Sequence, residues 1–321
     1  MSDNDSDPGA QLTSIDDVVQ RIDRVRDQIR RRMVGQEDVI DQLLACVICD
    51  GNALLESTPG LGKTMLIRTI AAVTDLSFSR IQNTPDLMPS DIIGTEIIRE
   101  TNRGREFEFQ RGPVFANIVL ADEINRATPK TQSALLEAME EQQVTAGGET
   151  YALPSPFFLL ATQNPIDQEG TYALPEAQAD RFMMKIRVEY PSAEEEREIV
   201  DRYTQEVDRQ IAVDRVLDAD SLRRIQELTH QVPIADDLRD RAVDIVQRTR
   251  RSDAIEYGAS PRASMSLVRA AKARALLAGR PHVSSEDLDA MALPVLRHRI
   301  IIDFRAEREG LTEDDVIRDL L

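Results

Sequence analysis

The sequence predicts an α/β domain, with a parallel sheet flanked by helices, followed by an all-helical domain. Between residues 15 and 190, short apolar runs of strand length alternate with longer runs of helical periodicity. This alternation is typical of parallel sheets whose two faces are covered by helices. After Pro191 the strand-like runs stop, and helical segments follow one another. A chain of 321 residues is long enough to form two such domains.

We expect three regions along the chain. Residues 1–14 are polar and acidic, with neither a basic start nor an apolar run, which predicts a disordered tail rather than a secretory signal. Residues 15–190 are expected to form the α/β domain, and residues 191–321 the helical domain. No apolar run approaches the roughly 18 residues that a membrane span requires. We therefore expect a cytoplasmic protein.

The first domain begins with two predicted helices. A charged helix over 15–32, capped by Ser14 or Asp16, precedes an apolar helix, and Cys46 and Cys49 are expected in this second helix or just after it. A zinc site would require a second pair of ligands, which is missing, so we interpret both cysteines as core residues. The strands expected after them are 53–55, 78–82, 118–121, 157–162 and 183–188, and the helices between these strands are 65–73 and 130–142.

Two segments interrupt the alternation of strands and helices. The segment 85–113 is irregular and offers only short strands, whereas the glycine pair Gly147 and Gly148 predicts a hairpin. The strands expected here are 95–99 and 106–109, around a turn at 102–104, and 143–146 and 150–153. In the second domain, helices are expected to begin near residues 193, 218, 236, 262, 284 and 310.

The most informative motif connects the first strand to the next helix. It reads Ser57-Thr58-Pro59-Gly60-Leu61-Gly62-Lys63-Thr64, and a glycine-bearing loop that ends in Lys-Thr before a helix is typical of a phosphate-binding P-loop. Backbone N–H groups and the positive end of the helix dipole attract phosphate there. Lys63 is expected to reach the β- and γ-phosphates of ATP, and the Thr64 hydroxyl to ligate Mg²⁺. The expected nucleotide-binding residues are Pro59, Gly60, Leu61, Gly62, Lys63, Thr64 and Met65.

Ser57 departs from the usual P-loop pattern, which has glycine at this position. Glycine adopts positive φ angles that other residues resist. The change is therefore neutral if φ at Ser57 is negative, and it weakens nucleotide binding if φ is positive.

Polar residues follow two further predicted strands. Asp122 and Glu123 come directly after the strand 118–121. Asp122 is expected to hold Mg²⁺, and Glu123 to orient and polarise the attacking water. Asn164 follows the strand 157–162. Because strands of such sheets present ligand contacts at their carboxyl ends, we expect Asn164 near the γ-phosphate.

Two arginines complete the candidate catalytic residues. Arg181 lies just before the last strand of the sheet, and Arg262 opens a helix of the second domain. Phosphoryl transfer needs cations opposite the equatorial phosphate oxygens, and a guanidinium offers a fixed fork of donors. Only four of the 39 basic residues are lysines, which leaves 35 arginines, so each of the two could equally form a surface salt bridge.

Together these motifs resemble the MoxR family of AAA+ ATPases. The resemblance runs from about Gly35 to Leu320 and rests on strings that are specific in combination. The strings are GLGKT at 60–64, TPDLMPSD at 84–91, ADEINRA at 121–127, QSALLEAMEE at 132–141, ATQNP at 161–165, LPEAQADRF at 174–182 and GASPR at 258–262.

The resemblance implies a fold and a role for each candidate residue. The fold is a P-loop NTPase module of the AAA+ type, followed by an all-helical lid domain. Asp122 and Glu123 look like the Walker B pair, and Asn164 resembles the sensor 1 residue. Arg181 is similar to the finger that such rings insert into a neighbour's ATP site, and Arg262 resembles sensor 2.

The resemblance also implies a ring. An arginine supplied to a neighbour's site forces head-to-tail contacts, and such contacts close into rings. We therefore expect a homo-oligomer, a hexamer by analogy.

The segment 85–113 resembles the helix-2 insert of this clade, and the hairpin at 143–153 resembles its pre-sensor hairpin. Asn83 stands where the family often has an aromatic residue, and we take it as a candidate link between the nucleotide state and Glu123.

The composition limits the classes of partner. The formal net charge is −18 and the pI is near 4.7, which argues against a nucleic-acid binder with a basic face. Many acids, few lysines and few aromatic residues resemble proteins from salt-loving archaea, in which salt screens the repulsion between like charges. An ordinary acidic cytosolic protein is the alternative.

We interpret the chain as an ATPase that hydrolyses ATP to ADP and phosphate and remodels partner proteins. The family resemblance suggests clients with von Willebrand A domains and metal-dependent adhesion sites, matured in a chaperone-like way. The alternatives are an ATPase subunit of a complex like magnesium chelatase, a nucleic-acid motor, and a nucleotide-gated scaffold without hydrolysis. The acidity of the chain weighs against the motor, and Glu123 and Asn164 weigh against the scaffold.

Overall fold

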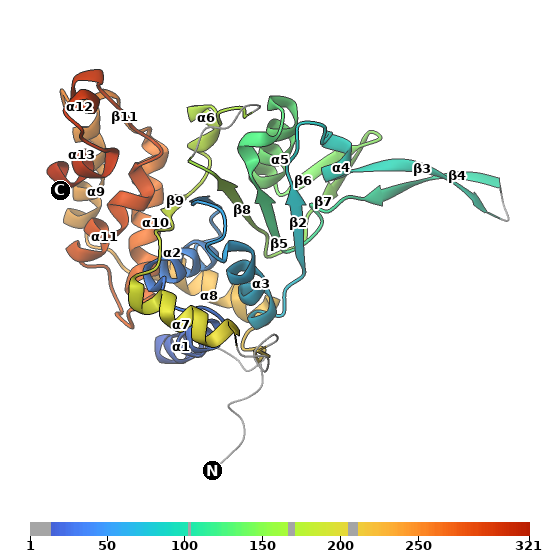
Figure 1. Ribbon diagram of the computed structural model, residues 1–321, viewed down its shortest axis with the longest axis horizontal. Helices are drawn as coiled ribbons and strands as arrows, with labels where there is room; N and C mark the ends of the chain where they lie inside the picture. The colour runs from blue at the N-terminus through green and yellow to red at the C-terminus, as the bar shows by residue number, and fades with distance from the viewer. Residues whose placement is uncertain (1–13, 102–103, 166–170, 205–210) are drawn as a thin grey trace, which may run out of the picture.

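A five-stranded parallel sheet forms the centre of the computed structural model (Figure 1). The structure describes residues 14–101, 104–165, 171–204 and 211–321. The predicted tail at 1–14 lies outside these residues apart from Ser14. The strands of the sheet are β1 (Ala53–Glu56), β2 (Phe78–Gln82), β5 (Ile118–Asp122), β8 (Phe158–Gln163) and β9 (Met184–Arg187). Their order across the sheet is β2-β5-β8-β1-β9.

Helices cover both faces of this sheet. Successive side chains of a strand point to opposite faces, and those of β5 divide accordingly. Ile118 and Leu120 join the core on one face, whereas Val119 and Ala121 join the core on the other. The helices that cover the sheet are α1 (Ile15–Arg32), α2 (Glu37–Ile48) and α3 (Lys63–Val73) on the first face and α5 (Pro129–Glu141) on the second. The predicted α/β architecture is confirmed.

The start of α1 and the two cysteines lie as the sequence predicts. Ser14 caps the helix, since its Oγ accepts a hydrogen bond of 3.1 Å from the N–H of Asp17. Cys46 in α2 and Cys49 just after it are free thiols and fully buried. Burial raises the pKa of Cys49 to about 12, so this thiol stays protonated as an inert part of the core.

Two hairpins project from the sheet domain. Their strands are β3 (Gly94–Thr101) with β4 (Gly104–Arg111) and β6 (Gln143–Ala146) with β7 (Glu149–Ala152). Figure 1 shows β3 and β4 extending far from the body of the molecule. Residues 102 and 103 of the predicted turn lie outside the described residues. The rings of Phe109 and Tyr151 stack with centroids 4.4 Å apart, which joins the two hairpins.

The first hairpin corrects one detail of the sequence analysis. The segment 85–113 is more regular than predicted. Its strands are longer than expected, and a short helix, α4 (Pro89–Ile93), precedes them. A proline at the first position of α4 fits the start of a helix, where the missing N–H leaves no bond unmade.

The second domain is mainly helical. Its elements are α7 (Ala193–Thr204), α8 (Ala219–Gln231), α9 (Asp236–Thr249), β10 (Ile255–Tyr257), α10 (Pro261–Leu277), α11 (Ser285–Leu296), β11 (Ile301–Ile302), α12 (Phe304–Arg308) and α13 (Glu313–Leu320). The antiparallel pair of β10 and β11 is missing from the prediction of an all-helical domain. Strands of three and two residues are too short to show alternation in the sequence.

One hydrophobic core runs through both predicted domains. It contains residues of β1 and α3 together with residues of α8, α10 and α11, and α2 packs against α8 and α10. The boundary near Pro191 therefore stays a prediction, since the cores on its two sides are continuous. Among the described residues, no helix combines the length and apolar character needed to cross a bilayer.

Candidate nucleotide-binding site

The P-loop lies between β1 and α3, as the sequence predicts. Gly60 and Gly62 adopt left-handed backbone angles, with φ of 89° and 76°, and only glycine does so without steric cost. Gly62 is the N-cap of α3, so the amino end of this helix opens directly into the loop. The Lys63 Nζ lies over the loop and donates to the carbonyl oxygens of Ser57 and Thr58 at 3.1 and 3.3 Å. This is a loop shaped to receive phosphate.

Ser57 fits the P-loop without strain. It is 2 % exposed and does not belong to the non-glycine residues with positive φ in the described chain. Its N–H donates to the Gln163 carbonyl at 3.1 Å, which joins the loop to the neighbouring strand β8. The loop does not require a positive φ at this position, so serine replaces glycine here without strain.

A cavity of about 530 Å³ adjoins the P-loop. Its walls come from the loop itself, from the segment between α1 and α2, and from the start of the second domain. The lining residues are Arg32, Met33, Val34, Gln36, Pro59, Gly60, Leu61, Gly62, Met65, Tyr190, Pro191, Glu196, Ile199 and Tyr203. A mostly apolar cavity beside a phosphate-binding loop is suited to a planar base. Five of the seven predicted nucleotide-binding residues line it.

Asp122 ends β5 at the carboxyl edge of the sheet and is 8 % exposed. Its Oδ1 accepts a hydrogen bond of 2.7 Å from the Thr162 hydroxyl, and its Oδ2 accepts two from Arg80, at 3.1 Å from Nε and 2.5 Å from Nη2. Thr162 also accepts from the N–H of Glu123 at 2.8 Å. The carboxylate is therefore held in place by β2 and β8, the two strands beside its own.

Glu123 has an unusual backbone conformation. Its φ of 54° and ψ of 55° are left-handed, which is strained for a residue with a side chain. The carboxylate contacts Arg126 Nη1 at 2.9 Å and Gln82 Nε2 at 3.4 Å. Strain of this kind is found where a fold fixes the direction of a functional side chain.

Asn83, the candidate link between the nucleotide state and Glu123, does not contact the Glu123 side chain. Asn83 is fully buried, and both its N–H and its side-chain amide donate to the backbone carbonyl of Asp122, at 3.0 and 2.8 Å. It contacts the residue before Glu123 and not the Glu123 carboxylate. Gln82, one residue earlier on the edge of β2, makes that contact instead.

The carboxyl ends of three neighbouring strands bring the remaining predicted residues together. Strand β8 lies between β5 and β1 in the sheet, so Asn164 at its end sits between Glu123 and the P-loop. Burial lowers the pKa of Lys63, while the charges of Asp122 and Glu123 act in the opposite direction. The lysine and the two carboxylates therefore interact electrostatically across the same edge.

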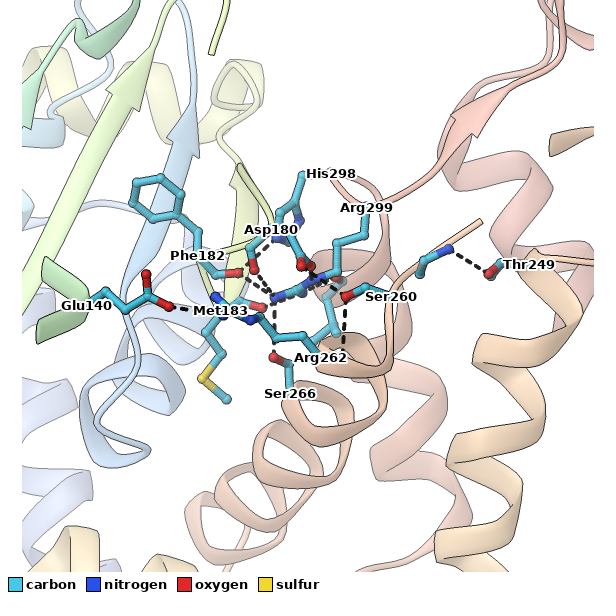
Figure 2. Close-up of polar contacts among 12 residues, drawn as sticks. Glu140, Asp180, Phe182, Met183, Thr249, Ser260, Arg262, Ser266, His298 and Arg299 are labelled. Atoms are coloured by element: carbon cyan, nitrogen blue, oxygen red, sulfur yellow. Dashed lines mark hydrogen bonds and ion pairs between the residues drawn. The ribbon is translucent and has the colours of Figure 1, made fainter. Parts of the chain in front are cut away.

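Arg181 and Arg262 lie elsewhere. Among the ion pairs of the described residues, neither contacts Asp122 or Glu123, whose partners are Arg80 and Arg126. Instead, both contact Glu140 on the last turn of α5. Arg181 Nη1 lies 3.0 Å from Glu140 Oε2. Arg262 Nη2 lies 3.0 Å from Glu140 Oε1 (Figure 2). The structure thus divides the predicted site residues into two groups.

The second group sits where the sheet domain meets the helical domain. Figure 2 shows Asp180, which directly precedes Arg181, among Ser260 and Arg299 of the second domain. Arg299 Nε donates to Asp180 Oδ1 at 2.8 Å, and the Ser260 hydroxyl donates to Asp180 Oδ2 at 2.9 Å. The side chain of Arg299 is only 1 % exposed. Arg299 is thus a buried cation paired with the partly exposed Asp180, which is 24 % exposed. Its guanidinium also donates to the carbonyl oxygens of Met183 and Phe182, and a buried charge is tolerated when it has such partners.

Comparisons with known proteins fit this geometry. Residues 52–184 match the model of the ATPase family associated with various cellular activities (AAA), and residues 247–320 match the AAA lid domain. The chain is 44 % identical to Chaperone MoxR1 of Mycobacterium tuberculosis, over 94 % of this chain and 81 % of that protein. It is 31 % identical to Protein MoxR of Methylorubrum extorquens, over 92 % and 91 % of the two chains. The chain belongs to the MoxR family of AAA+ ATPases.

A solved structure supports the same assignment. A proposed ATPase from Cytophaga hutchinsonii has 42 % identity and a TM-score of 0.87, and the match covers 94 % of each chain. The sheet domain is therefore an AAA+ module, and the second domain is its lid. As a MoxR-family ATPase, the chain is an ATP-hydrolysing enzyme that binds nucleotide.

Sequence reasoning missed several residues of this MoxR-family site. Arg80 and Thr162 hold Asp122, and Arg126 holds Glu123. Tyr203 of α7 lines the cavity. Thr162 and Arg126 lie within the family strings at 161–165 and 121–127. Arg80 has a different signal, because it shares a strand face with Gln82, the residue that pairs with Asp122 across the sheet. Glu140 gave no signal beyond its place in a family motif.

Proposed function

We propose that the chain hydrolyses magnesium ATP in a homo-oligomeric ring, a hexamer by family analogy, and uses the energy to remodel client proteins. One observation carries this proposal. The P-loop, Asp122 and Glu123 share one edge of the sheet, whereas Arg181 and Arg262 lie together at another place on the same chain. A site divided in this way becomes complete when the arginines of one subunit meet the P-loop of the next.

The residues at the sheet edge fit a nucleotide with its metal. The glycine backbone and the amino end of α3 suit the phosphates, and Lys63 suits the β- and γ-phosphate oxygens. Thr64 and Asp122 would hold Mg²⁺, because hydroxyl and carboxylate oxygens are the ligands that this cation takes. When bound, Mg²⁺ supplies positive charge that offsets the charge on the phosphate oxygens.

The chemistry of hydrolysis falls to three groups in this proposal. Glu123 orients the attacking water and polarises it as a general base, a role for which its fixed left-handed backbone is suited. Asn164 positions the same water by hydrogen bonding. Arg181 and Arg262 of the adjoining subunit donate to the phosphate oxygens as negative charge develops there.

For clients, we propose proteins that carry a von Willebrand A domain. The support is the family membership and the name of one relative, Chaperone MoxR1. The projecting hairpin of β3 and β4 provides a surface for contact with protein. Its cross-strand pair Ile98 and Phe107 is 59 % and 76 % exposed, and this apolar area is available for contact with a partner protein.

The substitution Glu123→Gln tests the proposed hydrolysis. The amide keeps the size of the side chain and cannot accept the proton of water. We expect ATP binding to remain within about twofold of wild type and phosphate release to fall at least about 100-fold. Nucleotide binding is measured by fluorescence of a labelled ATP and hydrolysis by phosphate release, both at high salt. Near-normal turnover in this variant would contradict the assignment.

A further inference from the structure

Glu140 occupies a special place between the two arginines. It lies on the last turn of α5, and its side chain is 34 % exposed. Each of its carboxylate oxygens contacts a different arginine, one from the sheet domain and one from the lid. In Figure 2 the Glu140 side chain points toward Arg262 at the junction of the sheet domain and the lid.

The Glu140 carboxylate lowers the electrostatic repulsion between Arg181 and Arg262. Two guanidinium groups brought close together repel each other, and a shared carboxylate offsets that repulsion. Each arginine places one guanidinium nitrogen 3.0 Å from a Glu140 oxygen, and a guanidinium carries five N–H donors. The other donors of Arg181 and Arg262 remain suited to a third, anionic group such as phosphate.

The backbones that carry the two arginines are also tied together. Asp180, the residue before Arg181, accepts hydrogen bonds from Arg299 and from Ser260, two residues before Arg262. Arg299 also donates to the Phe182 carbonyl, the residue after Arg181, at 2.6 Å. The chain on either side of Arg181 is thereby fixed to the lid. The remaining freedom lies in the long arginine side chains, which Glu140 restrains.

We propose that Glu140 is a positioning residue that holds Arg181 and Arg262 side by side as one cationic unit for the ATP of the adjoining subunit. The inference rests on the proposed function and adds a residue to it. Glu140 does not touch the nucleotide in this account. It acts through the two arginines, and losing its charge allows them to separate. Small displacements of catalytic groups lower rates strongly, by as much as about 100-fold for about 1 Å.

Two other roles make different predictions. An ordinary surface salt bridge contributes little to stability and has no effect on turnover. If Glu140 instead held the two arginines away from the adjoining subunit, its replacement would raise turnover. The direction of the change in kcat therefore separates the three roles.

The experiment compares Glu140→Gln with Glu141→Gln, a matched control at the exposed neighbouring position. We expect Glu140→Gln to lower kcat at least about 10-fold, with unchanged binding of a fluorescent ATP analogue to the subunit's own P-loop. The control should match wild type. In a background that lacks both arginines, Arg181→Ala with Arg262→Ala, adding Glu140→Gln should lower kcat no further, because Glu140 acts through these two side chains.

Three results overturn the inference: a wild-type kcat in Glu140→Gln, a raised kcat, or an equal loss in the control. If Glu140→Gln loses thermal stability, Glu140→Asp decides, since it keeps the charge on a shorter side chain. A kcat above that of the glutamine variant supports positioning, and an equal kcat overturns it. If Arg181→Ala itself hydrolyses ATP at the wild-type rate, the interfacial site of the proposed function fails instead.

Discussion

One buried carboxylate, that of Asp287, accepts hydrogen bonds from several parts of the lid. Asp287, at the start of α11, is fully buried, and its oxygens accept hydrogen bonds from Arg274 at 2.6 Å, Arg280 at 2.6 Å and the Ser284 N–H at 2.9 Å. Burial favours the neutral acid, but the hydrogen bonds from Arg280, Ser284 and Arg274 outweigh it and lower the pKa of Asp287. The charged form is therefore the form that stabilises the fold.

The substitution Asp287→Asn tests this role. Asparagine cannot accept all the charge-assisted hydrogen bonds that Arg274 and Arg280 donate to Asp287. Because the two arginine side chains are 36 % and 32 % exposed, water compensates part of the loss, and we expect the free energy of unfolding to fall by about 2 kcal/mol. Asp289→Asn on the same helix is the control, because Asp289 is 39 % exposed and pairs only with Arg241 among the ion pairs of the described residues. It should cost at most about 1 kcal/mol. Equal losses in the two variants would contradict the account.

The same experiment has a defined pH dependence. Because the pKa of Asp287 is lowered on folding, its contribution is fully present above the ordinary value of 3.8 and is lost as the pH falls through the lowered value. The difference between wild type and Asp287→Asn, measured by chemical unfolding, should thus be constant near neutral pH and shrink below pH 3.8. A stability difference that grows as the pH falls would contradict a lowered pKa of Asp287 in the folded protein.

At the scale of residues, the sequence predicts the candidate residues at the sheet edge better than the residues that hold them in place. Lys63, Asp122 and Asn164 were found because each follows or ends a recognisable strand or loop, and the structure brings them to one edge of the sheet. Their supports are long-range contacts. Arg80 and Glu140 are ordinary surface-type residues in the sequence, and only the fold brings them to their partners.

At the scale of elements, buried strands and amphipathic helices were predicted correctly because their apolar patterns are strong. The strand β8 differs from its prediction by one residue at each end, within the uncertainty of any boundary. The missed elements are short. The strands β10 and β11 and the helices α6 (Glu176–Ala179) and α12 depend on contacts made elsewhere in the chain rather than on local periodicity.

At the scale of the whole molecule, the chain carries a formal net charge of −18. Like charges oppose folding and assembly at low ionic strength, and salt screens them. This is the physical basis for proposing that the protein works at high salt. It also sets the conditions for every assay described above.

We expect the unfolding temperature to rise by about 5 °C or more between about 0.1 M and about 2 M KCl, since each kcal/mol of stability shifts it by about 2–4 °C. Circular dichroism melts measure the change. Sucrose at matched osmolality is the control for general exclusion of solutes from the protein surface. A midpoint that is flat or falls with salt, or that rises equally in sucrose, would contradict a role for charge screening.

The central claim is that ATP bound by one subunit is hydrolysed with arginines from the next. The most direct measurement mixes Arg181→Ala with Glu123→Gln in equal amounts and follows phosphate release. Each variant alone should be nearly inactive. In random mixed rings, about one interface in four joins an intact Glu123 to an intact Arg181, so we predict about a quarter of the wild-type rate. A rate no higher than the average of the two variants alone would contradict the claim.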